Sequence, residues 1–165
     1  MTPKQIADAY QERGYDFIAF TDHDYLLKPD YRDVYSGVSS DMILFQGIEY
    51  TVFVKGYVHV NKIEGVDENL HIFNHVSEYD LTPEQIIDRL SVLESLYPID
   101  AIEVTSKGFR VQEFEDMPVK YPKLASDDAH DLVGIGRAWI ELDADRDKDS
   151  IIKAVKNGDF WNCYL

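Results

Sequence analysis

Residues 14–24, GYDFIAFTDHD, join a short apolar run to a cluster of polar side chains. The run from Tyr15 to Phe20 is continuous and ends abruptly, which is typical of a buried strand. The polar cluster that follows leaves His23 at the carboxyl end of this strand. The same order, an apolar strand followed by polar groups, recurs along the chain.

Helix signals alternate with strand signals. Residues 2–5, Thr-Pro-Lys-Gln, offer a capping residue, a proline at the first helical position and a glutamine three residues after the cap, so they predict a helix over 3–13 that Gly14 ends. The same signal at Thr82 predicts a helix to about Leu96. We expect strands at 42–45, 51–54, 57–63, 72–73, 100–104, 138–142 and 160–164, and a last helix over 148–157. The alternation predicts an α/β fold with a largely parallel sheet.

The length and charge of the chain limit its organisation and its partners. A chain of 165 residues, 45% of them hydrophobic, is long enough for one sizeable core, so we expect a single domain over 1–165. The net charge is -15, and no segment is rich in lysine or arginine. This argues against binding to long nucleic acids, which requires basic residues along the phosphate backbone.

The cysteine count and the hydropathy point to a cytoplasmic protein. Cys163 is the only cysteine, so the chain has no internal disulfide and no thiolate pair for a metal. No apolar run approaches the roughly 18 residues that cross a bilayer. We therefore expect no membrane partner and a cytoplasmic location.

Four of the five histidines lie in short polar clusters that follow hydrophobic runs: His23, His59, His75 and His130. Glu49, in Gly47-Ile48-Glu49, and Asp128 add carboxylates to this set. The carboxyl ends of parallel strands meet at one edge of a sheet, so these groups are expected to converge. Imidazole with carboxylate is a ligand set used for zinc, manganese and iron, and the sequence therefore predicts a divalent-metal site.

In order and approximate spacing, these motifs resemble those of the PHP domain, the polymerase and histidinol phosphatase superfamily of metal-dependent phosphoesterases. The matching pieces span nearly the whole chain: Thr2-Pro3, residues 14–23 ending in Thr-Asp-His, Gly47-Ile48-Glu49, His59, His75, Ser126 to His130, and Gly134 to Arg137. Each piece alone occurs by chance in many proteins. Seven pieces in the same order make the resemblance specific.

The resemblance implies a distorted (βα)7 barrel with up to three divalent metal ions at its mouth. By analogy, Glu49 would bridge two ions, with His59 and His75 on the second ion. His23 and His130 would serve a third ion and Asp128 the first. The family's opening strand with His-x-His would precede Thr2 and is absent from this sequence, so we expect a barrel without its first strand. Asp127, outside the Asp-x-His spacing, is expected to accept hydrogen bonds or cap a turn.

The implied activity is hydrolysis of a small phosphorylated substrate by metal-bound hydroxide, with Asp128, His130 and Glu49 as catalytic residues. Arg137 is the candidate for binding the substrate phosphate, although a surface or intramolecular salt bridge would explain it as well. Two alternatives stay open. One is a degenerate PHP module that binds a phosphorylated ligand or a protein without turnover. The other is an amidohydrolase-type enzyme acting on a C–N bond.

Overall fold

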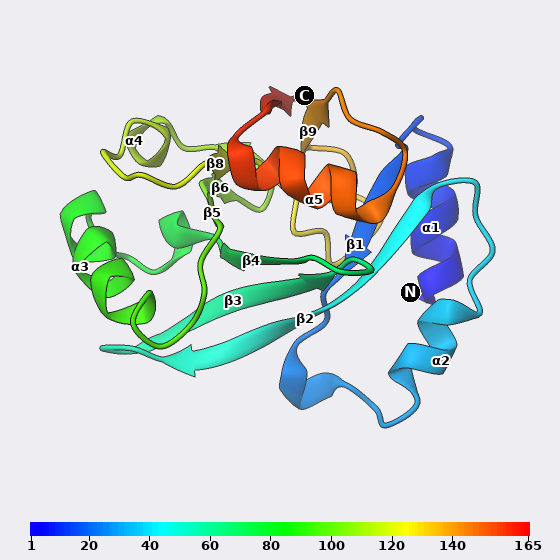
Figure 1. Ribbon diagram of the computed structural model, residues 1–165, viewed down its shortest axis with the longest axis horizontal. Coiled ribbons are helices and arrows are strands. Elements are labelled where there is room, and N and C mark those ends of the chain that lie inside the picture. The colour runs from blue at the N-terminus through cyan, green and yellow to red at the C-terminus, as the bar shows by residue number, and fades with distance from the viewer.

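The computed structural model describes residues 1–165, and a curled, mixed six-stranded sheet runs through it as a half-barrel (Figure 1). The strands lie in the order β1-β2-β3-β4-β5-β8. Their bounds are Phe17–Phe20 (β1), Ile43–Phe53 (β2), Tyr57–Glu64 (β3), Asn69–Phe73 (β4), Ala101–Glu103 (β5) and Lys123–Leu124 (β8). Two antiparallel pairs lie outside this sheet: β6 (Thr105–Ser106) with β7 (Phe109–Arg110), and β9 (Ala138–Leu142) with β10 (Phe160–Tyr164).

Five α-helices accompany the strands. They are α1 (Pro3–Gln11), α2 (Tyr31–Ser36), α3 (Pro83–Leu93), α4 (Gln112–Glu115) and α5 (Lys148–Asn157), with short 3-10 turns at Asp24–Leu26 and Val76–Glu78. None of these helices is both long enough and apolar enough to cross a bilayer.

The expectation of a (βα)7 barrel is wrong, although the α/β class holds. A βα barrel needs a helical crossover between successive strands, and such a crossover takes a dozen or more residues. Only residues 54–56 separate β2 from β3, and only residues 65–68 separate β3 from β4. These three strands therefore pair antiparallel as consecutive hairpins, while the pairings β1–β2, β4–β5 and β5–β8 are parallel. The resulting sheet is mixed and does not close.

The turn between β2 and β3 shows why the chain reverses there. Lys55 and Gly56 both have positive φ, 51° and 122°, a conformation that glycine adopts at no steric cost. The turn brings Phe53 opposite Tyr57 and Thr51 opposite His59. β3 is thus the one strand of the sheet that runs against the other five, and its first residues lie at the edge where the neighbouring strands end.

Several predicted elements have the expected bounds. The strands 138–142 and 160–164 and the helix 148–157 match β9, β10 and α5. The helices predicted over 3–13 and to about Leu96 end earlier, at Gln11 and Leu93, and residues 43–53 form one strand in place of two. The sequence did not predict α2, α4 or the β6–β7 hairpin.

The two faces of the sheet are covered by different helices. Val58, Val60 and Phe73 belong to a core cluster that contains the buried face of α3. Because side chains alternate along a strand, Ile63, Leu70 and Ile72 point to the other face, where they pack against α5. A third cluster joins α1 and α2 to β1. The face that carries α5 also carries the side chains discussed below.

The cap of α3 gives a first test of this architecture. Thr82 Oγ1 accepts a hydrogen bond from the Gln85 N–H at 3.4 Å, and Gln85 Oε1 accepts one from the Thr82 N–H at 2.9 Å, which is a complete capping box. Thr82→Ala should lower the free energy of unfolding by about 1 kcal/mol, measured by urea denaturation. Ser91→Ala, on the exposed face of the same helix, is the control and should lower it by less than about 0.5 kcal/mol. Equal losses in both variants would contradict the role of the cap.

Candidate metal centre

His23 and Glu49 meet where β1 runs beside β2. The Glu49 N–H donates to the Asp22 carbonyl at 3.1 Å, and an isolated parallel bridge pairs His23 with Glu49. This places His23 Nδ1 only 2.6 Å from Glu49 Oε2. The pair lacks the directional geometry of a hydrogen bond, so Nδ1 is a buried nitrogen without a hydrogen-bond partner. Buried polar atoms are normally satisfied, which makes this one a candidate for another ligand.

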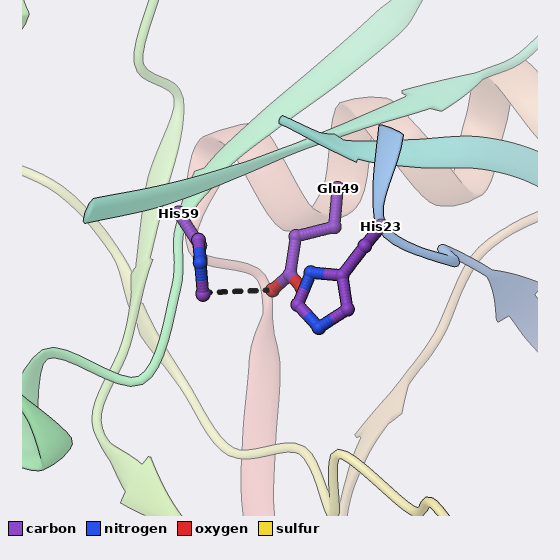
Figure 2. A group of neighbouring side chains, drawn as sticks. All are labelled: His23, Glu49 and His59. Atoms are coloured by element: carbon purple, nitrogen blue, oxygen red, sulfur yellow. Dashed lines mark ion pairs between the residues drawn. The ribbon is translucent and has the colours of Figure 1, made fainter. Parts of the chain in front are cut away.

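The register of the β2–β3 hairpin brings His59 to the same carboxylate. Glu49 lies opposite Asn61, and His59 is two residues from Asn61 on the same face of the sheet. His59 Nδ1 is 3.8 Å from Glu49 Oε1. One ligand atom from each of His23, Glu49 and His59 lies within 4.8 Å of the other two, and Figure 2 shows the three side chains converging.

His75 reaches this group through an unusual backbone conformation. Asn74 Nδ2 donates to Glu49 Oε1 at 2.7 Å, and His75 Nε2 lies 3.8 Å from the same oxygen. Consecutive residues of an extended strand point to opposite faces, so both cannot reach Glu49 from a regular strand. His75 has φ 29° and ψ 50°, which turns the chain at the end of β4. Backbone strain of this kind clusters at functional sites.

His23, Glu49, His59 and His75, which we call the Glu49 cluster, fit a divalent ion. His59 Nδ1 and His75 Nε2 are 2.8 Å apart, and each is 3.8 Å from Glu49 Oε1. Ligands at about 2.0 Å from a tetrahedral ion lie about 3.3 Å from one another, so each of these three separations is within about 0.5 Å of that value. Glu49 Oε2 faces His23 on the other side. The donor set and its spacing could therefore hold a metal ion.

The charge around the cluster also favours a cation. Glu49 and Glu103 are 6% and 3% exposed, and neither they nor Asp128 form an ion pair with a lysine or an arginine. Burial lowers the pKa of His75, but the carboxylates of Glu103, Glu49 and Asp128 outweigh it and raise this pKa to about 9. Burial and the charge of Glu103 raise the pKa of Asp128 to about 6. The site thus attracts positive charge, as a metal site must.

Asp128 and His130 lie beside the cluster. Asp128 Oδ2 is 3.9 Å from His75 Nδ1, the ring nitrogen that faces away from Glu49. His130 has a side chain that is 69% exposed, and its ring centroid lies 6.5 Å from that of His23. Its Nδ1 is 2.9 Å from the Asp128 carbonyl oxygen. The structure therefore brings all six predicted ligands into one region, with Glu49 at the centre and His130 at the solvent side.

Asp127 is turned away from the ligands. Its Oδ1 accepts a hydrogen bond from the Tyr10 hydroxyl at 2.8 Å, and its Oδ2 accepts one from the Gly136 N–H at 2.6 Å. This is the hydrogen-bond acceptor role predicted from the sequence. It ties the segment that carries Asp128 to α1.

Arg137 packs on the β6–β7 hairpin. Its guanidinium lies over the Phe109 ring, 5.0 Å from the centroid, and its Nη1 is 3.4 Å from the Lys107 carbonyl oxygen. It forms no ion pair with a carboxylate, so the salt bridge that the sequence left open is not present. Its contact with a substrate phosphate stays a prediction.

Two polar residues of the site were missed by the sequence analysis. Asn74 hydrogen-bonds Glu49, and Glu103 accepts a hydrogen bond from the His75 N–H at 2.9 Å. Glu103 ends the apolar strand Ala101–Glu103, much as His23 follows β1. The pattern that selected His23, a polar residue at the end of an apolar strand, therefore also fits Glu103.

Residues 119–160 match the family model described as PHP-associated. This match relates the chain to the PHP family. The matched residues include Asp128, His130 and Arg137 and extend from the loop before β8 to the start of β10. The Glu49 cluster lies outside them, so its agreement with the PHP motifs rests on the sequence pattern. The chain matches none of the curated proteins with which it was compared.

Proposed function

We propose that this chain hydrolyses small phosphate esters at a divalent-metal centre held by the Glu49 cluster. The observation that carries the proposal is the convergence of three imidazoles on the two oxygens of one buried carboxylate. A divalent ion at such a site lowers the pKa of a water molecule and stabilises negative charge on phosphoryl oxygens. The PHP-associated match supports the choice of phosphate esters over amides.

The chain's own residues have separate tasks in this proposal. Glu49 supplies negative charge to both sides of the cluster, and Asn74 holds one of its oxygens in place with a 2.7 Å hydrogen bond. His130 is assigned to the substrate side because its side chain is exposed and lies beside His23. Asp128, next to the outer nitrogen of His75, completes the proposed catalytic group with Glu49 and His130.

Arg137 is proposed to bind the substrate phosphate. In a chain with a net charge of -15, a phosphate needs a local positive charge to approach, and the guanidinium of Arg137 is not neutralised by a carboxylate. Guanidinium groups bind phosphate oxygens through two parallel hydrogen bonds. The guanidinium lies over the Phe109 ring, 5.0 Å from its centroid, which is a stacking contact that favours this position of the side chain.

The proposal is tested by comparing two histidine variants. Purified protein is stripped with a chelator and reconstituted with Mn²⁺, Zn²⁺ or Fe²⁺, and its metal content and its hydrolysis of p-nitrophenyl phosphate are measured. His59→Ala should lower both by at least about tenfold, because it removes a nitrogen from the cluster. His71→Ala, the control, removes an imidazole that faces Asp100 at 3.3 Å, and should leave both within about twofold of the unmodified protein.

The outcomes separate the candidate functions. Loss of metal and activity together in His59→Ala supports the phosphoesterase. Protein that binds metal and hydrolyses no phosphate ester from a panel would contradict it and support a ligand-binding module. Faster cleavage of amides than of esters would support an amidohydrolase-type activity.

A further inference from the structure

Glu103 is a buried carboxylate that the proposed reaction does not use. It is 3% exposed, and its two oxygens face different partners. Oε2 accepts a hydrogen bond from the His75 N–H at 2.9 Å and lies 3.6 Å from His75 Nδ1. Oε1 accepts a hydrogen bond from the Ser126 hydroxyl at 2.7 Å and lies 3.1 Å from the Thr105 hydroxyl. Burying a carboxylate that has no lysine or arginine partner costs free energy, which its hydrogen bonds offset only in part.

The two nitrogens of His75 face opposite directions. Nε2 faces Glu49 and His59 inside the cluster. Nδ1 has no hydrogen-bond partner, and the carboxylate oxygens it faces are Glu103 Oε2 at 3.6 Å and Asp128 Oδ2 at 3.9 Å. A histidine that ligates a metal through one nitrogen normally presents the N–H of its other nitrogen to a carboxylate or a carbonyl, which fixes the tautomer and the ring orientation. Glu103 stands where such a carboxylate is needed.

Glu103 also holds the backbone that aims His75. The positive φ of His75, 29°, is a strained backbone conformation that persists only if neighbouring groups hold it. Its N–H is bound by Glu103, and its carbonyl oxygen accepts a hydrogen bond from the Glu78 N–H at 2.8 Å. On the other side, Glu103 accepts a hydrogen bond from the Ser126 hydroxyl, and Ser126 lies two residues before Asp128. Asp128 also has a positive φ. One carboxylate therefore links the ends of β4 and β8 at the site.

We propose that Glu103 is a positioning residue of the metal centre, which orients the His75 imidazole so that Nδ1 carries the proton and Nε2 is free to bind the ion. This inference rests on the proposed metal centre. A purely structural Glu103, needed only by the Thr105 and Ser126 hydroxyls, would support folding and leave metal affinity unchanged.

The chain offers a matched control for this proposal. Asp100 precedes β5, and its Oδ2 accepts a hydrogen bond from the His71 N–H at 2.8 Å and lies 3.3 Å from His71 Nδ1. The arrangement repeats that of Glu103 with His75, on the same pair of strands. His71, however, contributes no atom to the Glu49 cluster. Asp100 differs in that its Oδ1 lies 3.9 Å from Lys156 Nζ. Glu103→Gln and Asp100→Asn thus make the same chemical change at two carboxylate–histidine contacts, only one of which serves the cluster.

The experiment measures Zn²⁺ affinity by chelator competition in the unmodified chain, Glu103→Gln and Asp100→Asn. Glu103→Gln should weaken Zn²⁺ binding by about 10–100-fold, whereas Asp100→Asn should change it by less than about threefold. Equal affinity in Glu103→Gln and the unmodified chain would overturn the proposal. Failure of the unmodified chain to bind Zn²⁺ would instead overturn the metal centre itself.

A second measurement does not depend on the folding of a variant. Nitrogen chemical shifts of the histidine rings in the unmodified, Zn²⁺-loaded chain report which ring nitrogen carries the proton. We expect His75 with Nδ1 protonated and Nε2 bound to the ion. Ligation through Nδ1, or a proton on Nε2, would contradict the assigned role of Glu103.

Discussion

A Glu49→Gln variant should lose most of its bound metal, with the affinity for Zn²⁺ or Mn²⁺ reduced by at least about 100-fold. Glu49 is the only carboxylate whose two oxygens face His23 on one side and His59 with His75 on the other. Glutamine keeps the shape of the side chain, but it removes the negative charge and places an amide N–H₂ group where an oxygen ligand is needed. Hydrolysis of phosphate esters should fall in proportion to metal content.

The same variant should not be less stable when metal is removed. Glu49 is 6% exposed and has no lysine or arginine partner, so neutralising it relieves a buried charge, and this relief offsets the lost attraction between Glu49 and His75. The melting temperature of stripped Glu49→Gln should equal or exceed that of the stripped unmodified chain. Added Zn²⁺ should raise the melting temperature of the unmodified chain alone, because a ligand that binds only the folded state stabilises it.

Glu64→Gln is the control for this comparison. Glu64 also lies in the sheet, but it pairs with Arg32 at 2.7 Å, and this pairing holds its pKa at about 2. Its substitution should leave metal content unchanged. Equal metal content in Glu49→Gln and in the unmodified chain would contradict the central place of Glu49 in the site.

The sequence predicted the members of the candidate site better than it predicted the sheet that carries them. His23 and Glu49 each lie next to an apolar run, and that local pattern is visible without the fold. The pattern also implied that parallel strands would bring them together, which is correct for β1 and β2. His59 was different, because it lies near the start of a strand. It joins the site because β3 runs against its neighbours.

The prediction of a barrel was wrong because a resemblance between motifs constrains only a few residues. The topology of a sheet depends instead on the lengths of the connections between its strands. The turn at Lys55-Gly56 is itself a hairpin signal, and a hairpin leaves no room for a crossover helix. The roles of Asn74 and Glu103 depend on contacts between distant strands. Their hydrogen bonds to Glu49 and His75 form where the chain turns at His75, whose positive φ no single-sequence pattern predicts.

Phe73→Ala should be the most destabilising substitution near the site, lowering the free energy of unfolding by about 3–5 kcal/mol. Phe73 is fully buried, lies opposite Val60 and stacks on Tyr79 with ring centroids 5.9 Å apart. Truncation to alanine removes this packing and leaves a cavity between the sheet and α3. Domains of this size have stabilities of about 5–15 kcal/mol, so the loss is a large fraction of the total. Urea denaturation monitored by circular dichroism measures it.

Phe73 also supports the metal centre, because it immediately precedes Asn74 and His75. It stacks on the Tyr79 ring, and the Tyr79 hydroxyl accepts a hydrogen bond from the His59 N–H at 2.7 Å. Phe73→Ala should therefore weaken metal binding as well as folding, whereas a surface aromatic should affect neither. Phe53→Ala makes the same chemical change at a side chain that is 69% exposed on the same sheet, and should cost less than about 1 kcal/mol with unchanged metal affinity. A loss of stability in Phe73→Ala no larger than in Phe53→Ala would mean that the core between β3, β4 and α3 is not packed as the structure shows.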